Sequence, residues 1–271
     1  MALVDGNSLQ GVSATTLWTL RNRAAEAQRP DGVIDDPWAV TLFDAIRYDY
    51  DKFGSIERYH ALRALTFDTA LAEYLRTAPK AAVVALAEGL QTSFWRLDRA
   101  GVLNEATWYC VDLPPVVALR EQLLPRDARI VHLATSALDR SWMDRVDPSH
   151  GVFITAEGLL MYLDPDEVHA LIADCARRFP GGRFLFDGIP RWFSRRTLKG
   201  WRMSDRCIAP PMPFGLSPDE GVALAGEIPG VRAARDVSQL ARPAGRALWQ
   251  AADRIGVLRR RRTSITLLEF A

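Results

Sequence analysis

Short apolar runs alternate with longer helical patterns along most of the chain. The runs are continuous, as expected of strands buried on both faces of a parallel sheet. Strand, helix and strand at this spacing predict a doubly wound α/β sheet with right-handed crossovers. The expected strands cover residues 81–86, 106–111, 129–133, 151–155 and 183–186, and the clearest helices cover residues 114–124 and 164–179.

The two ends of the sequence depart from this alternation. Helical patterns fill the first part and predict an N-terminal cap over residues 1–78, followed by a core domain over residues 79–271. Residues 190–225 carry tryptophans, prolines and basic side chains, and are expected to form an insertion or lid. The expected cap helices run from Ser13 to Gln28, from Pro37 onward and from Ser55 to Arg76, and the last two strands are expected at 231–237 and 263–270.

Composition excludes several classes of protein. Apolar residues make up 48% of the chain, charged residues make up 25%, and the net charge is +1, so neither nucleic acid nor an anionic membrane is an expected partner. No apolar run approaches the roughly 20 residues that a membrane span needs, and the N-terminus does not look like a signal peptide. The 3 cysteines and 4 histidines form no disulfide or metal spacing, which favours a cytoplasmic protein without a metal.

A ligand is expected at the carboxyl ends of the first two predicted strands, where such sheets bind. The first strand runs into Ala87, Glu88 and Gly89, and a glycine there lets the backbone approach a ligand. Asp112 ends the second strand, where a Rossmann unit places an acid on ribose hydroxyls. Its alternative role is to cap the helix that begins at Pro114. The missing GxGxxG disfavours a nicotinamide oxidoreductase, and spacing alone leaves S-adenosylmethionine and other Rossmann ligands open.

Several motifs in order resemble the leucine carboxyl methyltransferase family, and most of all its bacterial tetracenomycin-type carboxyl O-methyltransferases. The resemblance implies a Rossmann-like methyltransferase core, a helical N-terminal cap and S-adenosylmethionine as cofactor. The segments that carry it are residues 23–26, 35–39, 62–68, 83–98, 111–114 and 156–163.

The resemblance also assigns roles to residues in the cofactor site. It implies that Asp112 binds the ribose, that Arg63 pairs with the methionyl carboxylate, and that Glu157 lies near the methionyl amino group. The loop of residues 135–139 is expected to flank the adenine. The remaining cofactor-binding residues expected from the matching motifs are Ala87, Glu88, Gly89, Leu113, Ser136, Ala137, Leu138 and Gly158.

Two positions depart from the family pattern. Ala87 replaces the first glycine of the usual Leu-Gly-x-Gly-Leu-Asp-Thr loop, and Gln91 replaces its acid. An alanine is tolerated there only at negative φ, so we expect Ala87 to keep an ordinary backbone. The adenine loop lacks the usual Asp-Leu pair, and Ser136-Ala137 takes that position.

The expected acceptor is a small molecule whose oxygen is methylated. A carboxylate needs no catalytic base because it is already ionised at neutral pH, whereas a phenol does. The candidate catalytic residues are His60 and Tyr162, with His60 as the base for a hydroxyl acceptor. The alternative for His60 is a partly exposed surface histidine. Alternatives to carboxylate methylation are a hydroxyl or phenol acceptor, and a family member that binds its ligand without transfer. The expected acceptor-binding residues are Trp18, Arg21, Arg23, Tyr162, Trp192 and Trp201, and either a monomer or a homodimer is expected.

Overall fold

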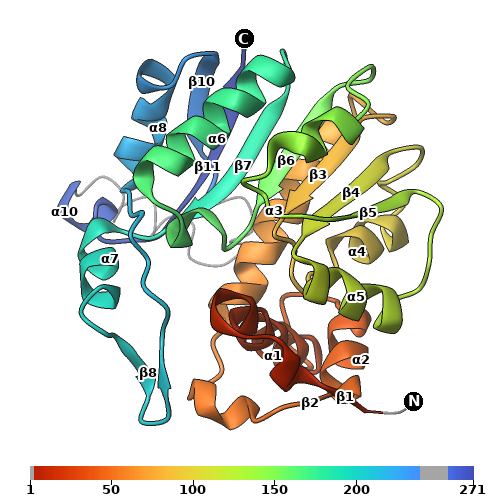
Figure 1. The fold of residues 1–271 in the computed structure, drawn as a ribbon, viewed down its shortest axis with the longest axis vertical. Coiled ribbons are helices and arrows are strands. Elements are labelled where there is room, and N and C mark those ends of the chain that lie inside the picture. The colour runs from red at the N-terminus through yellow and green to blue at the C-terminus, as the bar shows by residue number, and fades with distance from the viewer. Residues whose placement is uncertain (1–2, 239–255) are drawn as a thin grey trace.

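The computed structural model describes residues 3–238 and 256–271, and its centre is a seven-stranded sheet (Figure 1). The strand order is β10-β11-β7-β6-β3-β4-β5, with β3 to β7 parallel and β11 antiparallel to both of its neighbours. This confirms the predicted α/β class. The strands are β3 (Ala82–Leu86), β4 (Thr107–Asp112), β5 (Ile130–Ala134), β6 (Val152–Ala156), β7 (Arg183–Gly188), β10 (Val231–Asp236) and β11 (Ser264–Phe270).

Helices cover both faces of this sheet, which explains why its strands are continuously apolar. In β3, Val84 packs in the cluster that holds α6 and α8, while Val83 packs in the cluster that holds α3 and α4. Alternate side chains of one strand therefore enter two separate cores. The helices are α3 (Tyr59–Leu75), α4 (Ser93–Arg99), α5 (Pro114–Leu123), α6 (Pro165–Arg178) and α8 (Pro218–Glu227).

The N-terminal helices form a third apolar cluster at the end of the sheet where the parallel strands finish (Figure 1). This cluster joins α1 (Thr15–Ala27) and α2 (Pro37–Ala45) to the inner face of α5 through Leu17, Leu42 and Leu119. The small strands β1 (Val4–Asp5) and β2 (Ile46–Arg47) pair beside them. The shared cluster holds the N-terminal helices against the sheet, and the division at residue 78 stays a prediction.

The first three helices differ in how they begin. Asp36 caps α2, because its carboxylate accepts from the Ala39 backbone N–H at 3.0 Å, and the helix begins at Pro37 as predicted. α1 begins at Thr15 rather than at Ser13, since a 3₁₀ turn over Gly11–Ala14 runs directly into that helix. The third helix begins at Tyr59 rather than Ser55.

Residues 190–217 extend alongside the N-terminal helices (Figure 1). They contain α7 (Arg191–Thr197) and a small hairpin of β8 (Arg202–Ser204) and β9 (Cys207–Ile208). The Ser204 hydroxyl ties the hairpin to the cap by donating to the Lys52 carbonyl at 2.5 Å. The insertion was expected to reach residue 225, but α8 packs on β10 and β11 as part of the core layer. A last helix, α10 (Gly256–Arg259), precedes β11.

Membrane-spanning helices and metal sites are both absent from the part of the chain that the structure describes. None of the helices there combines the length and apolar character that crossing a bilayer requires. Within the same residues, no three or more His, Cys, Asp or Glu side chains are grouped to hold a metal ion.

Candidate active site

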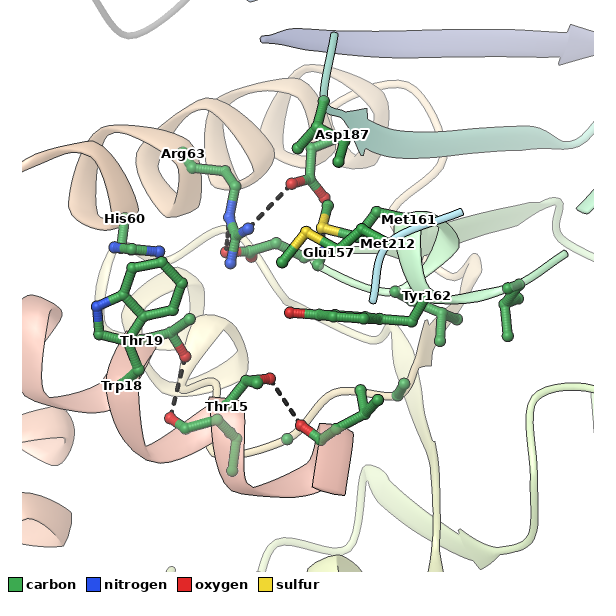
Figure 2. Close-up of a pocket in the computed structure, with 18 of the residues that line it drawn as sticks. Thr15, Trp18, Thr19, His60, Arg63, Glu157, Met161, Tyr162, Asp187 and Met212 are labelled. Atoms are coloured by element: carbon green, nitrogen blue, oxygen red, sulfur yellow. Dashed lines mark hydrogen bonds and ion pairs between the residues drawn. The ribbon is translucent and has the colours of Figure 1, made fainter. Parts of the chain in front are cut away.

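A cavity of about 550 Å³ lies where the carboxyl ends of the parallel strands β3 to β7 meet (Figure 2). Helices α1, α3 and α7 supply the opposite wall, so residues far apart in sequence face one another. This is the place where open α/β sheets bind their ligands. Most of the residues predicted from sequence line it: Trp18, His60, Arg63, Ala87, Glu88, Gly89, Asp112, Leu113, Ser136, Ala137, Leu138, Glu157, Gly158, Tyr162, Trp192 and Trp201.

The loop after β3 turns through left-handed backbone at two positions. The φ angle is 48° at Ala87 and 60° at Gly89. The expectation that Ala87 keeps a negative φ is therefore wrong. Its N–H still donates to Val111 of β4 at 2.8 Å, so the chain must turn immediately after that contact. At Gly89 an added Cβ would collide with the hydroxyl of Thr16, so cap and loop pack closely there.

Asp112 fixes this loop to the neighbouring strand. One carboxylate oxygen accepts from the Gly89 N–H at 2.6 Å and the other from the Leu113 N–H at 2.7 Å. Burial raises the pKa of Asp112, although the two N–H groups partly offset it. The capping alternative is wrong, because Leu113 occupies the N-cap position of α5 and no side chain caps that helix.

A buried arginine under the loop was missed from the sequence. Arg120 donates to the carbonyls of Gly89 at 2.7 Å and Gln91 at 2.8 Å. Its Nη2 also lies 3.0 Å from Glu88, and burial raises the pKa of that carboxyl despite Arg120. The available signal was an arginine on the same helical stripe as Val116, which packs inward. Arg120 therefore stabilises the loop through the two backbone carbonyls, and Glu88 contributes through its ion pair with Arg120.

Arg63 lines the cavity and is held between two carboxylates (Figure 2). Its Nε donates to Glu157 at 2.9 Å and its Nη1 to Asp187 at 2.9 Å. Burial alone would lower the pKa of Arg63, but Asp187 and Glu157 outweigh burial and raise it. Asp187 also accepts from the Gly158 N–H at 2.6 Å. Sequence analysis missed Asp187, although it ends a buried strand just as Asp112 does.

Gln91, the second departure from the family pattern, contacts Glu157, one of the two carboxylates that bind Arg63. Its amide nitrogen donates to Glu157 Oε1 at 2.7 Å, next to the bond from Arg63. Burial raises the pKa of Glu157, while Arg63 opposes the rise. A glutamine in this position therefore supplies a donor where an acid would bring a second negative charge.

Arg21 and Arg23 do not face the cavity, contrary to expectation. Arg21 donates to the Gly54 carbonyl at 2.7 Å on the outer side of α1. Arg23 is fully buried and donates to Asp36 at 2.6 Å and to the Leu90 carbonyl at 2.6 Å. Trp18 lines the cavity and these arginines do not, and Arg23 joins the N-terminal cap to the core through Asp36 and Leu90.

Aromatic and sulfur-containing side chains line the other end of the cavity. Tyr162 projects across it toward α1 (Figure 2). Trp201 packs edge-on against Phe193, with ring centroids 4.8 Å apart, in a cluster with Met161 and Met212. Trp192 is more peripheral: it is 45% exposed and its indole donates to the Arg261 carbonyl at 3.1 Å. The cavity thus has one charged and one largely apolar end.

The charged end suits S-adenosylmethionine by the chemistry of its donors and acceptors. Each Asp112 oxygen keeps a lone pair for a ribose hydroxyl after accepting its backbone N–H. Arg63 Nη2 and Glu157 Oε2 make no hydrogen bond to any described residue, and they match a carboxylate and an ammonium group. Ser136, Ala137 and Leu138 follow β5 on the side expected for the adenine.

Comparison with known proteins agrees with this geometry. The sequence model of the leucine carboxyl methyltransferase family matches residues 16–176. The tetracenomycin polyketide synthesis O-methyltransferase TcmP of Streptomyces glaucescens is 29% identical over 238 residues, covering 87% of this chain and 86% of that protein. A Parafrankia protein named as an S-adenosyl-L-methionine-dependent methyltransferase is 30% identical over 203 residues, covering 65% of this chain and 63% of its own length.

A solved structure has the same fold at much lower sequence identity. A methyltransferase from Thermobifida fusca superposes with a TM-score of 0.59 over 94% of both chains, at 16% identity. The family match covers more than half of this chain and includes the loop after β3, Asp112 and Glu157. The chain therefore belongs to the leucine carboxyl methyltransferase family and is an S-adenosyl-L-methionine-dependent methyltransferase.

Proposed function

We propose that this methyltransferase methylates a carboxylate oxygen of a small aromatic or polyketide-like acid and releases a methyl ester. The observation that carries the proposal is the division of one cavity into a charged cofactor end and an aromatic end. Similarity to TcmP, whose name describes an O-methyltransferase of polyketide synthesis, supports an acceptor of this kind.

The proposed chemistry asks mainly for orientation and exclusion of water. The cofactor supplies an electrophilic methyl group on a sulfonium. A carboxylate acceptor is ionised at neutral pH, so no residue has to remove a proton from it. Arg63, Glu157 and Asp112 hold the donor end, and the aromatic side chains hold the acceptor body in line. Tyr162 and Trp201 keep water from the space between them.

The test is transfer of labelled methyl from S-adenosylmethionine to aromatic acids, with matched phenols assayed in parallel. A methyl ester loses its label as methanol in mild base, whereas an aryl methyl ether does not. We expect a labelled product to form only when an aromatic acid is present, and we expect mild base to release its label. Base-stable label, or acids that are never methylated while phenols are, would refute carboxylate methylation.

A ligand-binding protein without transfer activity is a second candidate, motivated by the departures of Ala87 and Gln91 from the family loop. Tight binding of S-adenosylmethionine without turnover over a broad acceptor panel would identify this case. Methyl transfer to any acid would exclude it.

The proposal also covers the cellular location of the protein, its partner and its oligomeric state. We place it in the cytoplasm, because Cys110, Cys175 and Cys207 are all unpaired thiols. Its expected partner is a small-molecule acceptor rather than nucleic acid. Whether it acts as a monomer or a homodimer is a question for analytical ultracentrifugation.

A further inference from the structure

His60 is the one histidine that lines the described cavity, and it is buried rather than at the surface. It lies on α3 one turn before Arg63, with an exposed fraction of 3%. The expectation of a partly exposed surface histidine is therefore wrong. Figure 2 shows its imidazole beside the indole of Trp18, on the wall that faces Tyr162.

Packing and hydrogen bonding fix the orientation of this ring. The rings of Trp18 and Tyr59 meet it edge-on, at centroid distances of 4.5 and 5.4 Å. Its Nδ1 lies 2.9 Å from the side-chain nitrogen of Asn22 on α1. The other ring nitrogen, Nε2, makes no hydrogen bond to a described residue, and the ring lines the cavity.

The neighbours of Asn22 determine which ring nitrogen carries the proton. The backbone N–H of Glu57 donates to Asn22 Oδ1 at 3.0 Å, so that end of the amide must be the oxygen. The amide nitrogen then faces His60 and donates to Nδ1. In a neutral imidazole only one nitrogen is an acceptor, so the proton belongs to Nε2.

The surrounding charges keep this imidazole neutral. Burial lowers the pKa of His60 well below its ordinary value, and Arg63 and Arg23 lower it further. The carboxylates Glu157 and Asp187 both form ion pairs with Arg63 rather than with His60. Glu57, an exposed carboxyl that also lines the cavity, is not among the groups that shift the pKa of His60. The ring therefore presents a fixed N–H donor.

We propose that His60 is the anchor of an acceptor subsite, where its Nε2–H donates to one oxygen of an aromatic carboxylate. This inference rests on the proposed function and names the residue that selects the acceptor. Trp18, Tyr162 and Trp201 enclose the apolar body of the acid. His60 has no lone pair on Nε2 with which to deprotonate a phenol, so the same geometry disfavours hydroxyl acceptors.

The reaction balances without a base at this position. The second carboxylate oxygen contributes a lone pair to the new O–C bond. The S–C bond of the cofactor breaks with its electron pair remaining on sulfur. The products are a methyl ester and S-adenosylhomocysteine, and no proton leaves the acceptor. His60 orients the carboxylate and holds its own proton throughout.

The first test measures binding, so it does not require turnover. With S-adenosylhomocysteine bound, tryptophan fluorescence gives the affinities of 2-naphthoate and 2-naphthol. We expect wild type to prefer the acid by about 10-fold or more, from one hydrogen bond to a charged group. His60→Leu should abolish this preference, while His60→Gln, which keeps an N–H donor, should retain much of it. His150→Leu, on an exposed loop, is the matched control.

Nitrogen-15 NMR of His60 provides a second readout that needs no acceptor. We expect the Nε2–H tautomer, and Asn22→Asp should shift the proton to Nδ1. An Nδ1–H tautomer in wild type overturns the proposal. So does an unchanged preference for naphthoate in a folded His60→Leu protein. Failure of the proposed function is recognised separately, because S-adenosylhomocysteine would then not bind or no acid would be methylated.

Discussion

Ala87 carries a methyl group in a backbone conformation that favours glycine. Its φ of 48° lies in the left-handed region, and it is followed two residues later by Gly89 at 60°. Replacing Ala87 with glycine removes the clash between Cβ and the following carbonyl. It also gives the unfolded chain more freedom, which acts in the opposite direction. The sign of the change in stability therefore depends on which effect is larger.

Both contributions can be estimated for this position. A left-handed L-residue costs ~1–2 kcal/mol, and the added chain entropy of glycine costs ~0.4–1 kcal/mol. The net expectation for Ala87→Gly is stabilisation by about 0.5–1 kcal/mol. For a chain of this size that corresponds to a rise in Tm of about 1–4 °C. The affinity for S-adenosylmethionine should rise or stay equal, because the glycine loop loses a Cβ on the cavity wall.

Denaturant unfolding and thermal melts of the ligand-free protein measure this difference. Ala134→Gly is the matched control, since Ala134 is exposed and its backbone is not in the left-handed region. In that variant only the added freedom of the unfolded chain acts, so its free energy of unfolding should fall by about 0.4–1 kcal/mol. Equal destabilisation by the two substitutions would refute the argument from backbone strain.

Three further predictions follow from the charged groups of the site. Asp112→Asn should weaken S-adenosylhomocysteine binding about 10- to 100-fold in calorimetry, because an amide cannot accept at both oxygens. Gln91→Glu should weaken the same binding by about 10-fold, since it places a carboxylate against Glu157 instead of a donor. Burial opposes the effect of the two arginines on Asp36, but Arg96 and Arg23 lower its pKa from 3.8 to about 2. Its carboxylate therefore contributes about 2 kcal/mol of stability above pH 4, which is lost as pH falls toward 2 in denaturant titrations.

Each of these predictions has a control and a contrary outcome. Asp147→Asn, on an exposed loop, should leave binding unchanged beside Asp112→Asn. Gln10→Glu serves the same purpose for Gln91→Glu, and equal binding by both variants would remove the role assigned to the Gln91 amide. Asp36→Asn should show a shallower loss of stability in acid than wild type. An identical slope would mean that other carboxyls dominate acid unfolding.

Much of the architecture follows from the sequence because burial on both faces of a strand leaves a local signature. Continuous apolar runs located β3 to β7 to within a few residues, and the acids that end two of them pointed to the edge where the cavity lies. Asp112 was found from its position at the end of a strand, where a Rossmann unit places an acid, whereas Glu157 was expected from the resemblance to the family. Asp187 carried the same signal and was overlooked.

Tertiary structure alone decided how charges far apart in sequence are paired and which helix faces meet the cavity. Arg63 and Asp187 are 124 residues apart, and Arg23 turns from the acceptor to Asp36 because α1 packs through its apolar face. The left-handed backbone of Ala87 and the proton on His60 Nε2 also depend on neighbours from other elements. Periodicity in the sequence determines which residues are buried, whereas the partner of a buried polar group depends on distances that exist only in the folded chain.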